Sequence, residues 1–451
     1  MQYMKYNIWQ KILKYGFVFS FSMFVLVFFS GINSYDSIWN YSFSYAIAKG
    51  QIPFLEINMI TPGFYNFLMS LGLLISHNNI IFLMEQALLV TVTFAFLNKL
   101  FGDKAWLFLF FMSFSNFLAF CPTYNYLLLT LTILVIYLEV NKKSDYLIGV
   151  VLGLLILTKH TVGIILVIPS IIICFKDKKR LWQRFLGVFI PCSFYLIFLI
   201  VTGSFFKFLD LCFFGLLDFA GNNTDFVVSY FVLSLILLGI SIFYVIKYPK
   251  DIVGYYVLAF FAVMIPIFTA YHFHVYLVMV SLLLMQRLFI SRKGVVVLSL
   301  VLCFIVIGFN IFINYYGKSY TFLGYNNFNY LYLPKVSKEY FEDLNQLYHK
   351  YQKKGKVQIL SSKNPWIKIT NEENLNNFTV FLNGNFGYHG TEKMIKQINK
   401  NGQFYYILDR VEYNWSQVKG QFPIDIVEYV VKHSQLVEEK EPYQVYYFRR
   451  G

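Results

Sequence analysis

The stretch that decides the fold is residues 31–56, GINSYDSIWNYSFSYAIAKGQIPFLE, which follows the first apolar run of the chain. It holds two carboxylates, Asp36 near its start and Glu56 at its end, in a segment rich in aromatic residues. The pattern predicts a short amphipathic helix that Asp36 caps and that ends at Gly50, ahead of Pro53. The apolar stripe of this helix consists of Trp39, Phe43 and Ile47. A helix cap is therefore one explanation of Asp36, and a functional role is another.

The composition of the chain indicates a membrane protein. Of its 451 residues 57% are hydrophobic and 21% are aromatic, and the mean hydropathy is +0.55. Charged residues make up 14%, against about 25% in an average soluble domain. Apolar runs of nearly 20 residues recur, and each can cross about 30 Å of hydrocarbon. We predict an α-helical multi-pass membrane protein with about eleven spans and a small extracytoplasmic α/β domain at its C-terminus.

Basic residues between the apolar runs indicate the orientation. The predicted spans are residues 12–32, 80–100, 105–121, 126–140, 146–160, 162–175, 185–203, 227–247, 251–270, 276–291 and 294–314. With the N-terminus in the cytoplasm, seventeen Lys and Arg fall on the cytoplasmic side and three, Lys49, Lys159 and Lys207, on the outer side. Cytoplasmic loops carry such an excess. The net charge of +14 is thus an orientation signal and does not indicate nucleic-acid binding.

One apolar segment, residues 61–76, is short for a span and would invert every later loop if it crossed. We expect a re-entrant or interfacial helix on the outer face. Residues 33–79 then form one large outer loop with juxtamembrane helices. The chain divides into a transmembrane part at 1–314, a linker at 315–334 and an extracytoplasmic domain at 335–451.

Polar residues gather at the outer connections. Lys159 and His160 lie in LTKHTVG (157–163), and His272 and His274 lie in AYHFHVY (270–276). Such groups are costly to bury within a membrane, so we expect them to face a shared wet cavity. Each could instead snorkel or bond a backbone carbonyl. The two histidines stand two residues apart and would diverge on one helix, and no pair of ligands at i and i+4 indicates a metal site.

Several motifs follow one another in a recognisable order. They are Asp36 soon after the first span, WNY (39–41), AKGQIPFLE (48–56), TP (61–62), PTYNYLLLTLTIL (122–134), GLLILTKHTVGIIL (153–166) and YHFHVY (271–276). This order resembles the GT-C membrane glycosyltransferases, notably the bacterial branch related to protein mannosyltransferases and the aminoarabinose transferase. The resemblance covers most of residues 1–314, and it lies in the order of the features more than in any one motif.

The resemblance implies an inverting glycosyltransferase of the cell membrane. Its donor would be a polyprenyl-phosphate sugar, and its acceptor a polysaccharide, lipid or protein at the outer face. Asp36 takes the role of general base, Glu56 that of a second acid–base or acceptor-binding group, and Lys159 that of a partner for the donor phosphate. The remaining candidates are His160, His272 and His274 for the donor phosphate, and Trp39, Tyr124 and Asn125 for substrate binding.

The chain departs from the family pattern at two positions. A second acid often follows the first-loop Asp, and here that position is Ser37. Some members carry an acid in the outer loop where this chain has Asn125. Both departures put metal dependence in doubt, so no cofactor is assigned and a divalent metal stays an open alternative. A single clear outer carboxylate suits inversion better than a retaining pair does.

The C-terminal part alternates short β-rich runs with helical ones, which is typical of a small α/β domain. The predicted strands are 357–361, 378–382, 404–408 and 443–448, and the predicted helices are 338–354, 391–401 and 423–433. A glycine-rich stretch, FLNGNFGYHGTEKMI (381–395), precedes a helix that Thr391 would cap. It is either a plain turn or a cradle for an acceptor, sugar or phosphate.

Two other classes of function stay open. A transporter or flippase should have repeated halves and polar or broken helices near the midplane, and the sequence has no evident repeat. A surface-polymer polymerase or ligase would use the same lipid carrier. The five cysteines lie in the apolar part without paired spacing, which indicates packing residues and no disulfide framework.

Overall fold

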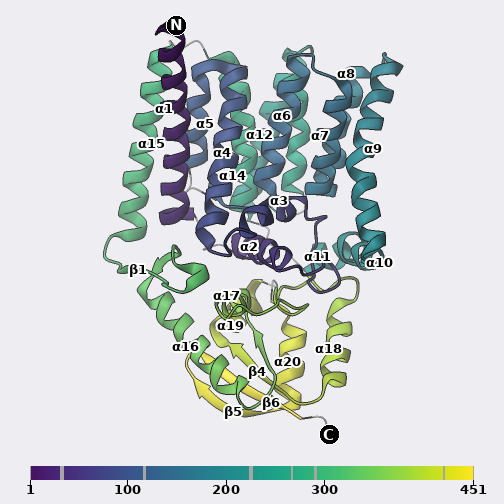
Figure 1. Ribbon diagram of the computed structural model, residues 1–451, viewed down its shortest axis with the longest axis vertical. Helices are drawn as coiled ribbons and strands as arrows, with labels where there is room; N and C mark the ends of the chain where they lie inside the picture. Colours follow the sequence, from purple (N-terminus) through teal and green to yellow (C-terminus); the bar gives the residue numbers. More distant parts are fainter. Residues whose placement is uncertain are drawn as a thin grey trace.

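The computed structural model describes residues 2–30, 35–114, 118–222, 227–265, 268–288, 292–419 and 422–449. It has two parts, a bundle of apolar helices and a smaller part of helices and strands that follows it in the sequence (Figure 1). The N-terminus lies at the end of the bundle that is distant from the smaller part. The two ends of the bundle therefore have different surroundings.

A helix lies at each position where the sequence predicts a span. These helices are α1 (Gln2–Val25, continued by a π-helical turn at Leu26–Ser30), α4 (Asn79–Phe101), α5 (Trp106–Ser113), α6 (Tyr124–Val140), α7 (Asp145–Thr158), α8 (His160–Cys174), α9 (Lys178–Val201), α12 (Val228–Lys247), α13 (Ile252–Phe260), α14 (Ala270–Arg287) and α15 (Arg292–Tyr315). Helices suit a bilayer because they satisfy all their backbone hydrogen bonds internally.

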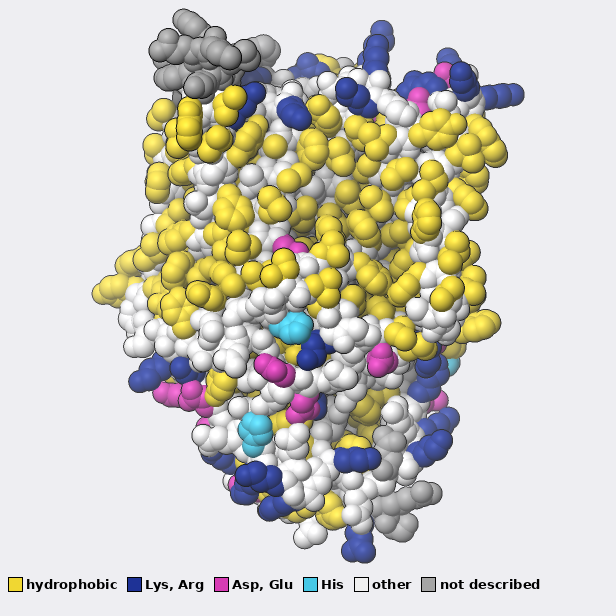
Figure 2. Space-filling view, in the orientation of Figure 1, with side chains coloured by type: hydrophobic (Ala, Val, Ile, Leu, Met, Phe, Trp, Pro, Cys, Tyr) yellow, Lys and Arg dark blue, Asp and Glu magenta, His cyan; other side chains and the backbone are white. Residues whose placement is uncertain are grey.

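Length and composition identify the membrane helices. Among the described residues, five stretches are long and apolar enough to cross a membrane, namely Ile8–Phe29, Asn79–Ser113, Lys178–Val201, Val228–Lys247 and Gly294–Ile313. Shorter apolar helices, among them α6, α7 and α8, accompany them. On the face that Figure 2 shows, apolar side chains form a belt across the bundle, and Lys and Arg side chains lie along the rim nearest the N-terminus. The protein is an integral, multi-pass membrane protein.

Helices α7 and α9 pack closely because glycines stand at their contact. A Cβ atom on Gly149 would lie 2.2 Å from the carbonyl oxygen of Arg184, and one on Gly187 would lie 2.3 Å from that of Tyr146. Small residues of this kind let two membrane helices approach at backbone distance. Helix α8 also packs on α7.

A buried ion cluster ties α6, α7 and α9 together near the rim of basic residues. Arg184 is 3% exposed, and its guanidinium donates to both carboxylate oxygens of Glu139 at 2.5 and 2.8 Å. Its Nε donates to Asp145 Oδ1 at 2.7 Å, and Arg180 pairs with the same carboxylate at 3.0 Å. A buried charge is tolerated only when it is paired in this way. The structure therefore gives Glu139 a structural role.

Short helices cover the opposite end of the bundle. They are α2 (Tyr35–Ala48), α3 (Phe64–Leu73), α10 (Phe205–Leu209), a π-helical turn at Asp210–Phe214 and α11 (Gly215–Asn222). Figure 1 shows them between the bundle and the smaller part. The segment expected to be interfacial, 61–76, contains α3. Asp36 lies in the first turn of α2, after Tyr35, so the expectation that it is the N-cap is wrong by at least one position.

The smaller part contains a four-stranded mixed sheet in the order β3-β4-β6-β5. Strand β3 (Val357–Leu360) runs parallel to β4 (Phe404–Asp409), and β6 (Tyr443–Phe448) runs antiparallel to both β4 and β5 (Ser434–Lys440). A small hairpin of β1 (Tyr320–Phe322) and β2 (Tyr332–Pro334) precedes them. The helices of this part are α16 (Lys335–Gln352), α17 (Asn364–Thr370), α18 (Gly390–Asn401), α19 (Arg410–Lys419) and α20 (Ile424–His433).

Two expectations for this part need correction. Residues 378–382 are irregular, and Phe378 and Phe381 pack into a small apolar core without joining the sheet. Strand β5 was not expected, because its sequence SQLVEEK is polar, as befits the sheet edge that it forms. The expected linker, 315–334, contains the β1–β2 hairpin.

Candidate functional site

A cavity of about 380 Å³ lies at the covered end of the bundle, within the size range of small-molecule sites. The bundle supplies residues of α6, α8 and α14 and of the turn between α7 and α8, and the covering segments supply residues of α2 and α11. Its lining consists of Asp36, Ile60, Thr61, Tyr124, Lys159, His160, Thr161, Ile165, Leu216, Ala262, Val263, Ile265 and His272. Five of the residues singled out in the sequence thus share one cavity.

Asp36 and Lys159 are the charged residues of this lining. Lys159 occupies the single extended position between α7 and α8, with φ −153° and ψ 96°, outside both helices. Burial raises the pKa of Asp36 above its usual value, and the Lys159 ammonium partly lowers it. Burial lowers the pKa of Lys159 to about 8, and the Asp36 carboxylate opposes that shift. The cavity therefore holds one base and one cation whose protonation states depend on each other.

Asn125 links Lys159 to His272. The Lys159 Nζ donates to Asn125 Oδ1 at 3.2 Å, and Asn125 Nδ2 lies 3.5 Å from His272 Nε2. On the other side of that ring, Nδ1 lies 2.8 Å from Thr269 Oγ1. Because the Asn125 oxygen accepts from an ammonium, its amide must donate to Nε2, which places the imidazole proton on Nδ1. Neutral His272 therefore fixes the amide that holds Lys159.

Aromatic rings complete the surroundings of Lys159 and His160. The Lys159 Nζ lies 5.4 Å from the centroid of the Tyr124 ring, a cation–π distance. The His160 ring lies in the first turn of α8, with its centroid 4.8 Å from that of Phe213. Phe213 belongs to the π-helical turn that covers the cavity.

His274 points away from the cavity. Its Nδ1 lies 2.5 Å from the carbonyl oxygen of Ala270, and its ring packs against Phe273, Tyr230 and Phe114. His272 and His274 both lie on α14 rather than in a turn, so they diverge, as their spacing predicts for a helix. The expectation of an outer turn at 270–276 is wrong.

Two further candidates lie outside the cavity lining. Glu56 is exposed, and its Oε2 accepts from the backbone N–H of Ile52 at 2.6 Å, so this carboxylate closes a turn. Trp39 is half-buried and packs against the apolar core of the bundle. The structure therefore does not bring these two side chains together with Asp36 and Lys159.

The donor set of the cavity does not fit a divalent metal. Within the part of the chain that the structure describes, no group of three or more His, Cys, Asp or Glu could hold a metal ion. The lining contains one carboxylate, Asp36, and two histidines, His160 and His272, but the three do not form such a group, and the Lys159 ammonium lies in the same cavity. A lysine of this kind suits a phosphate.

The sequence did not single out the residues that cover the cavity. Residues 205–218, here called the cover segment, include Leu216 in the cavity lining and Phe213 against His160. Within this segment Asp210 Oδ1 accepts from the backbone N–H of Tyr388 at 3.2 Å, and both of its carboxylate oxygens accept from Lys393 Nζ at 3.2 and 3.1 Å. The smaller part of the protein thus holds the cover segment.

The glycine-rich stretch 381–395 therefore cradles a carboxylate of the chain itself. Gly387 has φ +81°, and a Cβ atom there would lie 2.6 Å from Asp210 Oδ2. Helix α18 follows at Gly390, so the bound carboxylate lies near a helix N-terminus, where anions are favoured. The residue before the helix is His389, in a left-handed conformation, so the expected cap at Thr391 is wrong.

We expect Gly387→Ala to loosen the cover segment. The new Cβ meets both an unfavourable backbone angle and the Asp210 carboxylate, a cost of about 1–2 kcal/mol from the backbone alone. Hydrogen exchange of residues 205–218, followed by mass spectrometry, should become about tenfold faster. Gly402→Ala is the matched control, because Gly402 has φ +86° and open space around it. Equal exchange of the cover segment in the two variants would contradict a holding role for this contact.

Among solved structures, the chain has the same fold as two structures of one protein. The chain aligns with ArnT from Cupriavidus metallidurans bound to undecaprenyl phosphate with a TM-score of 0.52 and 11% identity, over 97% of this chain and 98% of that one. With the apo state of the same ArnT the TM-score is 0.51 at 11% identity, over 98% of each chain. ArnT is a GT-C family aminoarabinose transferase. The sequence matches no protein-family model and no curated protein. The expected GT-C resemblance is confirmed at the level of the fold.

Proposed function

We propose that the protein is a GT-C-type membrane glycosyltransferase that moves a sugar from a polyprenyl-phosphate donor to a cell-surface acceptor with inversion. The observation that carries the proposal is the presence of Asp36 and Lys159 in one cavity at the covered end of the bundle. The ArnT-like fold supports the class of reaction, since one of the ArnT structures holds undecaprenyl phosphate. The acceptor is a polysaccharide, a lipid or a protein.

The two charged residues of the cavity each have a task in this reaction. An acceptor hydroxyl oxygen attacks the anomeric carbon, and the Asp36 carboxylate takes its proton. The bond between that carbon and the phosphate oxygen breaks, and the prenyl phosphate leaves with one further negative charge. The Lys159 ammonium stabilises this charge, while Asn125 and His272 hold the ammonium in place. Attack opposite the leaving phosphate inverts the anomeric carbon.

The topology belongs to the same proposal. All eleven predicted spans cross the membrane, the N-terminus is cytoplasmic, and the cavity opens at the outer face. Basic side chains along the rim opposite the cavity support this orientation (Figure 2). Residues 335–451 then form an extracytoplasmic domain that holds the cover segment through Asp210 and borders the site where the acceptor arrives.

Transfer by the purified protein tests the proposal. In proteoliposomes with radiolabelled undecaprenyl-phosphate sugars and envelope extract, we expect label to pass to an acceptor and free undecaprenyl phosphate to appear. The label should enter as single sugars, whereas a polymerase would form ladders. Movement of the labelled lipid across the bilayer without transfer would contradict the proposal and favour a flippase.

A further inference from the structure

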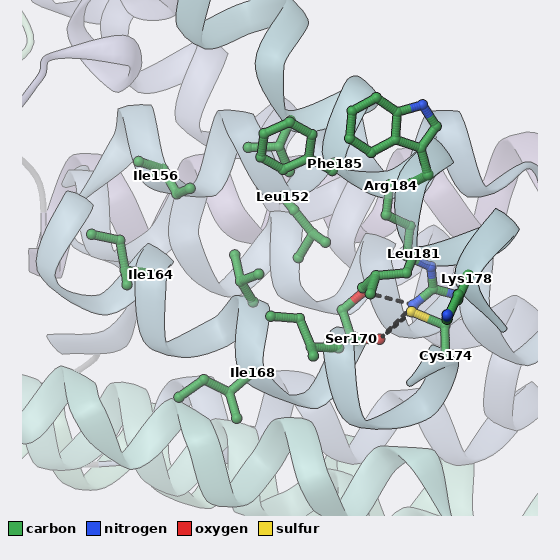
Figure 3. Close-up of a pocket in the computed structure, with 14 residues that line it drawn as sticks. Leu152, Ile156, Ile164, Ile168, Ser170, Cys174, Lys178, Leu181, Arg184 and Phe185 are labelled. Atoms are coloured by element: carbon green, nitrogen blue, oxygen red, sulfur yellow. Dashed lines mark hydrogen bonds between the residues drawn. The ribbon is translucent and has the colours of Figure 1, made fainter. Parts of the chain in front are cut away.

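A second pocket lies on the lipid-facing side of the bundle. It is an apolar groove of about 640 Å³ between α8 and α9, with α7 as its floor (Figure 3). Figure 3 shows isoleucines and leucines along its length, with Lys178 and Arg184 at one end. The lining consists of Leu152, Ile156, Ile164, Val167, Ile168, Ser170, Ile171, Cys174, Lys178, Leu181, Trp182, Arg184, Phe185 and Val188.

The groove opens outward, where lipid chains surround the bundle. Ile168 on one wall is 50% exposed and Trp182 on the other is 60% exposed. Along α8 the groove extends from Ile164 to Cys174, ten residue steps or about 15 Å. That length equals half of a hydrocarbon core of about 30 Å, so the groove matches the chains of one bilayer leaflet.

The charged end of the groove is the end that is distant from the cavity. Helix α8 begins at His160, which lines the cavity, and ends at Cys174, which lies with Lys178 at the charged end of the groove. Arg184 is already neutralised by Glu139 and Asp145. Among the described residues no carboxylate forms an ion pair with Lys178, which is exposed at the start of α9. An unpaired cation therefore ends an apolar groove at the membrane surface.

We propose that this groove binds one anionic phospholipid of the leaflet opposite the cavity. An acyl chain fills the groove between α8 and α9, and the headgroup phosphate pairs with Lys178. The neighbouring Lys176 and Lys179 add positive charge, against the single Asp177, whose carboxylate accepts from the N–H of Arg180. Basic pockets between membrane helices bind anionic headgroups in this way. The lipid would brace α8, the helix that carries His160 into the cavity.

Lipid binding to the full chain tests the proposal without any transfer assay. Native mass spectrometry of the detergent-solubilised protein should find one tightly bound dioleoyl phosphatidylglycerol and only weak binding of the phosphatidylcholine with the same chains. Lys178→Gln should weaken phosphatidylglycerol binding about fivefold, the effect of one lysine near an anionic lipid. Lys143→Gln is the matched control, because Lys143 is exposed just before α7 and does not line the groove.

A second pair of variants tests the groove itself. Ile168→Trp should fill it and abolish tight binding of phosphatidylglycerol, whereas Ile172→Trp, on the same helix, 54% exposed and outside the groove, should leave binding unchanged. A phosphatidylglycerol with a photoreactive acyl chain should label peptides of residues 164–188. Equal binding by both tryptophan variants, or equal affinity for the two headgroups, would overturn the proposal. Displacement of phosphatidylglycerol by undecaprenyl phosphate would also overturn it and assign the groove to the donor chain.

Discussion

Asp36→Asn should lower the rate constant of sugar transfer about a hundredfold to ten-thousandfold, the usual contribution of a general base. The amide keeps the size of the side chain but cannot take a proton from the acceptor hydroxyl. Because Lys159 still faces the donor phosphate, the affinity for undecaprenyl phosphate should be unchanged or higher. Initial rates in proteoliposomes and equilibrium binding of undecaprenyl phosphate measure the two quantities separately.

Glu56→Gln distinguishes the role of Glu56 from that of Asp36, the other carboxylate of residues 31–56. The Glu56 side chain closes a turn through the N–H of Ile52 and does not line the cavity, so we expect transfer within about threefold of the unmodified protein. Thermal unfolding of both variants controls for loss of fold. Full transfer by Asp36→Asn, or a greater loss in Glu56→Gln, would remove Asp36 from the role of base.

Much of this site could be predicted because charges are rare in an apolar chain. Counting basic residues puts Asp36, Lys159 and His272 on one face of the membrane, and the cavity then brings these three together. The positions of the helices could be predicted equally well, because a long apolar segment in a bilayer must satisfy its backbone hydrogen bonds internally, as a helix does. What the pattern detects in both cases is the cost of placing a polar group in hydrocarbon.

The contacts of the cover segment could not be predicted, because they join segments that are distant in the sequence and leave no local pattern. Asp210 bonds to Tyr388 and Lys393, which lie more than 170 positions away in the sequence. Gly387 is identified as a cradle for this carboxylate only when both segments are placed, and Leu216 carries no chemical signal at all. The predictions for β5 and for residues 378–382 were wrong for a similar reason. In both segments tertiary packing, and not the local sequence pattern, determines the backbone conformation.

Lys159→Met should reduce transfer about a hundredfold to a thousandfold, the range found when one group that stabilises transition-state charge is lost. The methionine keeps the bulk of the side chain but brings no charge to the leaving phosphate, so binding of undecaprenyl phosphate should weaken as well. This second effect distinguishes the variant from Asp36→Asn. Unaltered binding of undecaprenyl phosphate would contradict a phosphate-binding role for Lys159.

The pH profile of kcat/KM provides a sharper test of the same residue. The reaction needs Asp36 ionised and Lys159 protonated, so kcat/KM should fall as the pH drops through the raised pKa of Asp36 and fall again as it rises through about 8. In Lys159→Met the alkaline limb should vanish. The acid limb should move to higher pH, because the ammonium no longer lowers the pKa of Asp36.

Lys159→Arg tests the positive charge at position 159 separately from the loss of a proton by the Lys159 ammonium. A guanidinium stays protonated throughout the accessible range, so this variant should lose the alkaline limb yet keep the acid limb near its original position. Its rate should lie between those of the unmodified protein and Lys159→Met, since the planar fork fits the amide of Asn125 differently from an ammonium. An alkaline limb that persists in Lys159→Arg would assign that limb to another group and separate Lys159 from the ionisation that controls the reaction.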